Sequence, residues 1–186
     1  KFEDIDYEKV PSLAMSRYLK AFYKNDETRF DDFKDRLAEG TAKVNAGALY
    51  PYDVTKSILC GGDVKVSEAQ WDSLPNFMEG NDKRILPVVD TSGSMSCSVG
   101  GNPNLECIDI AISLGLYISE RNEGPFKDAF ITFSENPTLQ YLKGTLVERL
   151  ASLNSVDWGY NTNLEKVFQV VLKQALKNQV SPGEMP

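Results

Sequence analysis

The pattern of apolar and polar positions changes along this chain, and in its first part the pattern has the periodicity of helices. Between residues 11 and 23, and again between residues 26 and 40, apolar side chains recur at the spacing that places them on one face of a helix. Pro11 suits a first helical turn, because the N–H that proline lacks would have no partner there. Asp26 is placed to cap the second helix. These patterns predict helical hairpins at the start of the chain.

Two shorter helices are expected before the rhythm changes. One covers residues 53–59 and ends at a pair of glycines. The other begins at Ser67, because residues 67–70 have the capping-box pattern, in which the first and last side chains satisfy each other's backbone donors. A polar turn at residues 80–82 marks the expected boundary. We therefore expect residues 1–80 to form an all-α helical region.

From residue 83 onward, short apolar runs replace the helical rhythm. Residues 85–89 have the composition of a strand buried on both faces, although Pro87 weakens this assignment because it cannot donate to a β-ladder. Two further strands are expected at residues 129–133 and 138–142, and the short connection between them requires antiparallel pairing. The second half of the chain is therefore predicted to contain a sheet.

Helices are expected between and after these strands. Residues 105–121 are apolar nearly all round, so this helix should be the deeply buried one. Residues 146–153 are expected to form a short helix, and residues 164–175 carry an amphipathic stripe. Strands that alternate with helices predict an α/β domain over residues 83–186.

The composition places the chain among soluble globular proteins, since 41% of its 186 residues are hydrophobic and 25% are charged. Its net charge of -7 disfavours non-specific attraction to nucleic acid or anionic lipid. Lys20, Lys24 and Lys34 are expected to lie on solvated helix faces, which gives little support to RNA binding. No apolar run approaches the roughly 18 residues of a membrane span, so we expect no membrane partner.

Histidine is absent, which removes the imidazole base and every Ser-His or Cys-His nucleophile pair. The cysteines Cys60, Cys97 and Cys107 show no CxxC spacing, so neither a disulfide framework nor a zinc site is expected. These features favour a reducing, cytoplasmic location. Cys97 and Cys107 are either redox-sensitive or small buried hydrophobic residues, and we expect the second.

The candidate chemistry lies in the loop between these cysteines and the first strand, Asp90-Thr91-Ser92-Gly93-Ser94. An acidic residue at the end of a strand, followed by hydroxyls two and four positions later, places three hard oxygen ligands around one point. Such ligands suit Mg²⁺, and binding sites in open α/β sheets lie at this edge. The alternative is that Asp90 and Ser92 only cap the loop, a common role of these residue types after a strand.

Residues 88–96 resemble the metal-ion-dependent adhesion site (MIDAS) of von Willebrand factor A domains. The resemblance implies a Rossmann-like fold and a site in which Asp90, Ser92 and Ser94 hold Mg²⁺ or another divalent cation. In that family a threonine from a later loop and an aspartate after the fourth strand complete the site. The open position of the metal takes an Asp or Glu carboxylate from a partner protein.

Residues 158–163 resemble the loop that supplies the threonine, which makes Thr162 the fourth candidate ligand. The alternative is an N-cap for the helix that follows, a role open to Thr162, Asn161 or Asn163. The strand and aspartate that complete the family's site would follow residue 186. We therefore expect the sequence to hold about half of an A domain, truncated before its fourth strand and held by further sequence or by a partner.

A closer resemblance covers nearly the whole chain. Four segments look like a domain family of unknown function that joins a helical region to a von Willebrand A half: residues 44–49, 114–120, 130–137 and 157–163. That family is similar in layout to the Ro autoantigen (TROVE) proteins, in which a helical-repeat region binds small RNAs. The likeness to the Ro proteins is one of architecture.

Three functions follow as hypotheses. The leading one is a non-enzymatic interaction module that uses Mg²⁺, held by Asp90, Ser92, Ser94 and Thr162, to bind an acidic group of a partner protein. The second is a ribonucleoprotein component whose helical region binds RNA. The third, a metal-assisted phosphatase with Asp90 as nucleophile, is disfavoured because no second acid follows two residues later and no base is evident.

Overall fold

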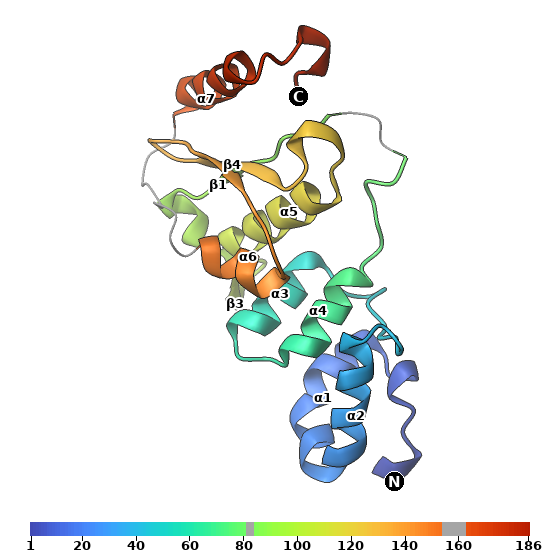
Figure 1. Cartoon of the computed structure of the whole chain (residues 1–186). Helices are drawn as coiled ribbons and strands as arrows, with labels where there is room; N and C mark the ends of the chain where they lie inside the picture. Colours follow the sequence, from blue (N-terminus) through green and yellow to red (C-terminus); the bar gives the residue numbers. More distant parts are fainter. Residues whose placement is uncertain (81–83, 154–162) are drawn as a thin grey trace. The chain divides into compact units, whose positions relative to one another are not determined.

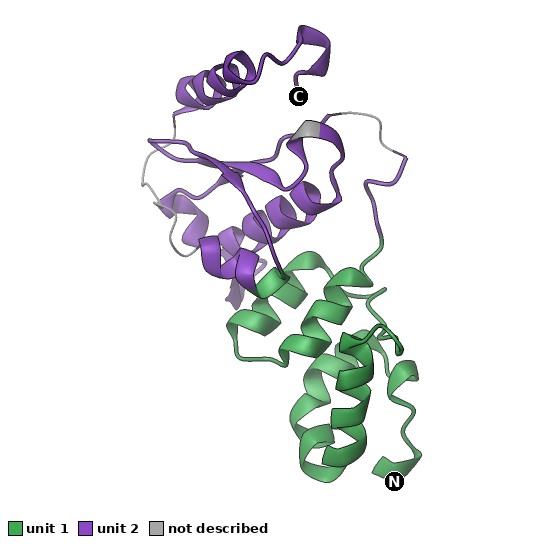
Figure 2. Cartoon of the chain, viewed as in Figure 1, with its two compact units in different colours: residues 1–75, 145–147 green, residues 76–144, 148–186 purple. Residues whose placement is uncertain are grey.

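The computed structural model describes residues 1–80, 84–153 and 163–186 (Figure 1). The chain forms two compact units, which Figure 2 distinguishes by colour. The helical unit comprises Lys1–Pro75 with Thr145–Val147, and the mixed unit comprises Asn76–Gly144 with Glu148–Pro186. Helices make up the first unit, whereas the second combines helices with strands, so the fold is mixed α/β over the described residues.

Helices α1 to α4 build the helical unit and agree with the helical pattern of the sequence. Their bounds are α1 Ser12–Asn25, α2 Glu27–Ala38, α3 Pro51–Leu59 and α4 Val64–Asp72. Short 3-10 helices precede them at Phe2–Asp4 and Tyr7–Lys9. Helix α2 packs against α1 and α4, and α3 packs against α4.

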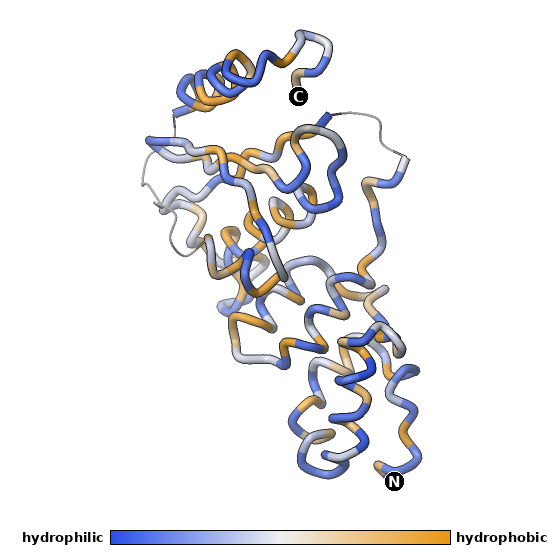
Figure 3. The backbone as a smooth tube through the Cα atoms, in the orientation of Figure 1, coloured by the Kyte–Doolittle hydropathy of each residue, from blue (hydrophilic) through white to orange (hydrophobic). Residues whose placement is uncertain are grey.

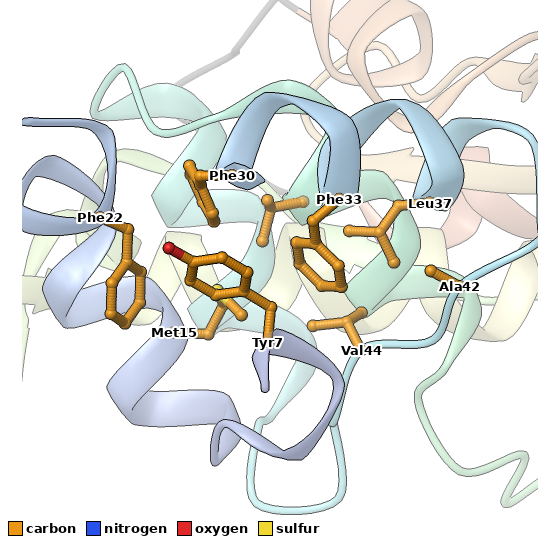
Figure 4. Packing of buried hydrophobic residues seen from close by; sticks show 9 residues of the cluster. Tyr7, Met15, Phe22, Phe30, Phe33, Leu37, Ala42 and Val44 are labelled. Atoms are coloured by element: carbon orange, nitrogen blue, oxygen red, sulfur yellow. The ribbon is translucent and has the colours of Figure 1, made fainter. Parts of the chain in front are cut away.

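An aromatic cluster forms the core of the helical unit (Figure 4). The ring of Tyr7 has its centroid 5.3 Å from that of Phe22, 5.1 Å from that of Phe30 and 5.4 Å from that of Phe33. These phenylalanines come from α1 and α2, and all three are buried. Because large buried aromatic side chains dominate core energetics, Tyr7 ties the start of the chain to both helices.

Asp26 occupies the N-cap position of α2, as predicted, but its side chain makes no capping hydrogen bond. Its Oδ2 instead accepts a hydrogen bond from the Tyr7 hydroxyl at 2.8 Å and pairs with Arg29 Nη1 at 2.9 Å. Burial raises the pKa of Tyr7 above its ordinary value, and the hydrogen bond to the Asp26 carboxylate raises it further. Asp26 therefore provides a hydrogen-bond partner for the Tyr7 hydroxyl, which would otherwise be buried beside the aromatic rings without one.

Helix α4 begins earlier than the sequence pattern suggests. Asp63 caps it, because Asp63 Oδ1 accepts a hydrogen bond from the Val66 N–H at 3.1 Å. Ser67, the predicted start, lies inside the helix, where it is buried and its hydroxyl contacts that of Ser57 at 3.4 Å. The capping-box pattern misleads here because Asp63 is an equally good cap one turn upstream.

Lys34 of α2 is buried, so the expected solvation of this lysine is wrong. Its ammonium group pairs with Asp31 at 2.7 Å and with Asp63 at 3.2 Å, and it lies 4.5 Å from the centre of the Tyr23 ring. Burial acts to lower the pKa of Lys34, but the hydrogen bonds to two carboxylates outweigh burial and the pKa is raised. The charge of Lys34 is therefore balanced within the helical unit.

The described part of the mixed unit contains a three-stranded sheet in the order β1-β4-β5. The strands are β1 Val88–Asp90, β4 Ala129–Phe133 and β5 Leu139–Tyr141. Strands β1 and β4 run parallel, and β4 and β5 run antiparallel, which confirms the predicted antiparallel pair. Strand β1 begins after Pro87, whose carbonyl accepts the N–H of Ile131 at 2.9 Å although proline has no N–H to donate.

Helix α5, Cys107–Arg121, packs against β1 and β4. It follows a ribbon of β2 (Ser98–Val99) and β3 (Asn102–Glu106), so it starts two residues later than expected. Gly115 permits the close approach, because a Cβ at this position would overlap with a methyl group of Val89 in β1. The expected deep burial of this helix is found on one side only: Leu116 and Tyr117 are buried, whereas Leu114 is 44% exposed.

Helices α6 (Leu146–Leu153) and α7 (Leu164–Lys177) follow β5. Short 3-10 helices lie at Gly124–Phe126 and Pro182–Glu184. Hydrophobic and hydrophilic residues alternate along α7 (Figure 3). Its exposed apolar residues recur every fourth position: Leu164, Phe168, Leu172 and Leu176. Within the described ranges, every helix is too short or too polar to cross a bilayer.

Candidate metal site

The candidate site lies at the carboxyl end of β1. Asp90 is the last residue of this strand and pairs with Phe133 at the end of β4. Because the two strands are parallel, the residues that follow each of them emerge at the same edge of the sheet. Ser134 follows β4 and is buried. This edge therefore carries the predicted acidic residue and one small polar residue that sequence reasoning missed.

The structure brings Asp90, Ser92 and Ser94 together. Asp90 Oδ1 accepts a hydrogen bond from the Ser92 N–H at 2.9 Å, and the hydroxyl oxygens of Ser92 and Ser94 lie 2.9 Å apart. The chain then turns into a 3-10 helix, Gly93–Ser96. Ser92 is buried whereas Ser94 is exposed, so the pair runs from the interior of the unit to its surface.

The loop-capping role of Asp90 is also present, because Asp90 accepts the backbone N–H two residues ahead of it. That bond uses one carboxylate oxygen and fixes the direction of the other. Capping and metal binding therefore do not compete in this loop: the cap orients the carboxylate, which retains an oxygen for a further ligand.

The spacing of the two hydroxyls fits an octahedral cation. Mg²⁺ takes oxygen ligands at about 2.0–2.1 Å in near-octahedral geometry, which places adjacent ligands about 2.9 Å apart. The hydroxyls of Ser92 and Ser94 are hydrogen-bonded to each other at 2.9 Å, a separation that is also compatible with adjacent ligands of such a cation. With the Asp90 carboxylate, they form a set of oxygen donors of the kind that Mg²⁺ prefers.

The three candidate ligands carry only one negative charge between them, that of Asp90. No group of three or more His, Cys, Asp or Glu side chains in the described residues is placed to hold a metal ion. The candidate site combines one carboxylate with two hydroxyls, and Ca²⁺ or Mg²⁺ affinity rises with the number of charged ligands. A divalent cation at this place would need further ligand oxygens from water, from another part of the chain or from a partner.

Thr162 lies outside the described residues, and the next residue, Asn163, lies at the edge of interest. The Asn163 N–H donates to the carbonyl of Ser134 at 3.2 Å. Asn163 Oδ1 accepts the N–H of Lys166 at 3.0 Å, so Asn163 is the N-cap of α7. The capping alternative for this loop thus falls to Asn163, and the metal role of Thr162 stays a prediction.

Thr91 points away from the candidate ligands. Its side chain is buried and lines a cavity of about 10 Å³ with Ile112 and Leu116 of α5. Its hydroxyl oxygen has no hydrogen-bond partner among the described residues. Thr91 therefore belongs to the interior between the sheet and α5. The hydroxyls of Ser92 and Ser94 are the ones that lie at the carboxyl end of β1.

Cys97 and Cys107 are not buried, so the expectation of small buried hydrophobic residues is wrong. Cys97 is exposed and Cys107 is half-buried. Their sulfur atoms lie 3.1 Å apart. Cys97 closely follows the loop that carries Ser92 and Ser94, and Cys107 is the first residue of α5.

A family model described as "Domain of unknown function (DUF7788)" matches residues 84–186, which is more than half of the chain. The chain belongs to the DUF7788 family. The candidate ligands Asp90, Ser92 and Ser94 all lie within the DUF7788 match. A second model, described as "Domain of unknown function (DUF2828)", matches residues 1–84, so the two matches meet close to the sequence boundary between helical and mixed patterns.

Uncharacterized protein L728 of Acanthamoeba polyphaga mimivirus is similar to this DUF7788 chain. The two are 30% identical over 202 aligned residues, which include all of this chain and 34% of the viral protein. The chain thus spans about a third of the length of this relative. No solved structure matches the chain.

Proposed function

We propose that the chain is a non-enzymatic, magnesium-dependent interaction module in which a von Willebrand A-like domain over residues 83–186 binds an acidic group of a partner protein. The observation that supports this most directly is the juxtaposition of Asp90, Ser92 and Ser94 at the carboxyl edge of a parallel strand pair. The helical region over residues 1–80 precedes this domain.

The topology of the mixed unit supports a Rossmann-like domain. The chain leaves β1, passes through α5 and returns to pair β4 parallel to β1. This crossover is the unit from which doubly wound α/β sheets are built, and their ligands bind beyond the carboxyl ends of the strands. The candidate ligands occupy that position.

Each residue of the loop has a distinct role in this proposal. The Ser92 N–H holds the Asp90 carboxylate in place, and burial of Ser92 fixes its hydroxyl within 2.9 Å of that of Ser94. Exposure of Ser94 leaves the outer side of the site open to a partner. Thr162 is the proposed fourth ligand. A bound Mg²⁺ supplies the positive charge that attracts the partner's carboxylate.

A pair of serines from the same 3-10 helix provides the test. Calorimetric titration of the chain with MgCl₂ should show that Ser94→Ala lowers the affinity at least about tenfold. Ser96→Ala, a change of the same type at an exposed neighbour, should leave the affinity unchanged. Asp90→Asn should abolish binding. Equal affinities of wild type and Ser94→Ala would overturn the proposed site.

A second experiment measures partner binding and tests the proposed interaction role. Association with a partner that presents an acidic residue should require Mg²⁺ and should be lost in EDTA. Binding that persists in EDTA with the Asp90→Asn chain would rule out a metal bridge. The RNA alternative gains no support from Lys34, because this lysine is paired with Asp31 and Asp63.

A further inference from the structure

The two cysteines at the base of the β2–β3 ribbon are close enough to react with each other. Cys97 Sγ and Cys107 Sγ are 3.1 Å apart, whereas a disulfide bond measures about 2.05 Å. The sulfurs therefore need to approach by only about 1 Å. Cys60, the other cysteine of the chain, belongs to the helical unit.

The backbone holds the two cysteines on facing segments of the ribbon. Ser98 and Glu106 are partners in the β2–β3 ladder, and the N–H of Cys107, one residue beyond Glu106, donates to the carbonyl of Cys97 at 3.0 Å. Cys97 directly precedes β2, and Cys107 is the first residue of α5. With the sulfurs 3.1 Å apart, this backbone hydrogen bond holds the two residues where a disulfide requires only a small approach.

We propose that Cys97 and Cys107 form a reversible dithiol–disulfide pair that is oxidised by peroxide and closes the β2–β3 ribbon. Two thiols lose two electrons and two protons in total, and one hydrogen peroxide is reduced to two waters. This is an intramolecular modification site, and it does not depend on metal binding by the neighbouring loop.

Exposure assigns the order of the two steps. Cys97 is the exposed sulfur, so its thiolate attacks the peroxide: an S–O bond forms, the O–O bond breaks, and the departing hydroxide takes a proton to become water. Cys107 then attacks the sulfenic sulfur of Cys97. The S–S bond forms, the S–O bond breaks, and the hydroxide leaves with the proton of the Cys107 thiol as the second water.

The neighbourhood of Cys107 agrees with its role as the resolving residue. Its hydrogen bond to the Cys97 sulfur raises its pKa above the ordinary value for a thiol, and burial and the Cys97 charge raise it further. The raised pKa favours the protonated Cys107 thiol, whose proton leaves with the departing hydroxide in the second step. Cys107 is also held within reach of Cys97 by the backbone bond between them.

The test oxidises the fully reduced chain with one equivalent of hydrogen peroxide and counts free thiols. Wild type should fall from three free thiols to one, with the mass of the chain lower by two hydrogen atoms and a crosslinked peptide that joins Cys97 to Cys107. Cys60→Ser should fall from two thiols to none. Dithiothreitol should restore the thiols. Cys97→Ser and Cys107→Ser should form no intramolecular disulfide.

Oxidation of the urea-unfolded chain is a control that tests whether the folded structure, rather than thiol reactivity alone, selects the Cys97–Cys107 disulfide. In urea, disulfides that include Cys60 should appear beside the Cys97–Cys107 pair, whereas the folded chain should give that pair alone. The same mixture from folded and unfolded chains would overturn the proposal, as would irreversible oxidation of Cys97 without loss of the Cys107 thiol. Because both results come from wild type, the test does not depend on whether a serine variant folds.

Discussion

The aromatic cluster of the helical unit and helix α7 of the mixed unit place their large apolar side chains in opposite ways. In the helical unit, Tyr7 and the phenylalanines around it are buried, and the one polar atom among them is satisfied by Asp26. In the mixed unit, α7 presents Phe168 at 66% and Leu176 at 72% exposure. An amphipathic pattern thus predicts that a helix forms, but it does not predict what covers the apolar face.

The units also differ in what their polar groups do. In the helical unit, Lys34 forms ion pairs with Asp31 and Asp63, so its positive charge is neutralised within the fold. At the edge of the mixed unit, Ser92 and Ser94 place two oxygens side by side near a carboxylate. The first arrangement balances charge within the fold, and the second is the arrangement on which the proposed Mg²⁺ site depends.

The largest effect should come from truncating Phe30 of the helical unit, with truncation of Phe168 in the mixed unit as the comparison. Phe30→Ala removes a ring that is 1% exposed, so it should lower the free energy of unfolding by about 3–5 kcal/mol. Phe168→Ala should change it by no more than about 0.5 kcal/mol. Urea unfolding followed by circular dichroism gives the totals, and hydrogen exchange assigns each loss to its unit. A cost for Phe168→Ala as large as that for Phe30→Ala would mean that α7 is covered in solution.

A smaller effect should follow from Gly115→Ala. The added methyl collides with Val89, and overpacking of this kind should lower the free energy of unfolding by about 2 kcal/mol. Gly47→Ala is the matched control, because no atom lies within 4 Å of a Cβ placed there. Val89→Ala should recover part of the loss when combined with Gly115→Ala. Strict additivity of the two changes in a double-mutant cycle would contradict the contact.

The smallest effects should have opposite signs in the two units. Tyr7→Phe removes a hydroxyl bonded to a carboxylate and should lower the free energy of unfolding by about 1.5 kcal/mol. Thr91→Val removes a buried hydroxyl without a partner among the described residues and should raise it by about 1 kcal/mol. Magnesium affinity should be unchanged in Thr91→Val, since Thr91 lies in the interior. Destabilisation by Thr91→Val would show that its hydroxyl is satisfied in solution.

The pH dependence of Tyr7→Phe provides an independent check. The pKa of Tyr7 is raised in the folded chain above the ordinary value of 10.0. Folding therefore favours the protonated phenol, and this contribution is fully present below pH 10 and is lost as the pH rises through the folded pKa. Wild type should lose more stability than Tyr7→Phe on passing into that alkaline range. Parallel curves for the two chains would contradict the raised pKa.

Local chemistry made some features predictable from the sequence. The helices of the helical unit follow from periodic apolar positions, and β4 and β5 follow from apolar runs with a short connection. The proximity of Asp90, Ser92 and Ser94 was predictable because they are nearly adjacent in the chain, so one turn suffices to bring them together, whereas their role as ligands stays a prediction. The role of Thr162 remains a prediction, because it lies outside the described residues.

Features that depend on distant partners were not predictable. Burial of Lys34 requires Asp63 from another helix, and no local pattern signals that pairing. Ser134 reaches the site edge only because β4 pairs with β1; a small polar residue directly after a predicted parallel strand was the available signal. The ribbon of β2 and β3 lacks the alternation of a strand, since residues 102–104 are Asn, Pro and Asn.

The contact between Gly115 and Val89 has an evolutionary consequence. Because any side chain at 115 would overlap with Val89, relatives that carry a larger residue at 115 should carry a smaller one at 89. The two positions should therefore covary across aligned sequences, even though 25 intervening residues separate them in the chain. Val89 directly precedes Asp90 in β1, so a substitution at position 115 of α5 also affects the strand that carries the acidic residue. Sequence changes in α5 and in the loop after β1 should therefore be coupled.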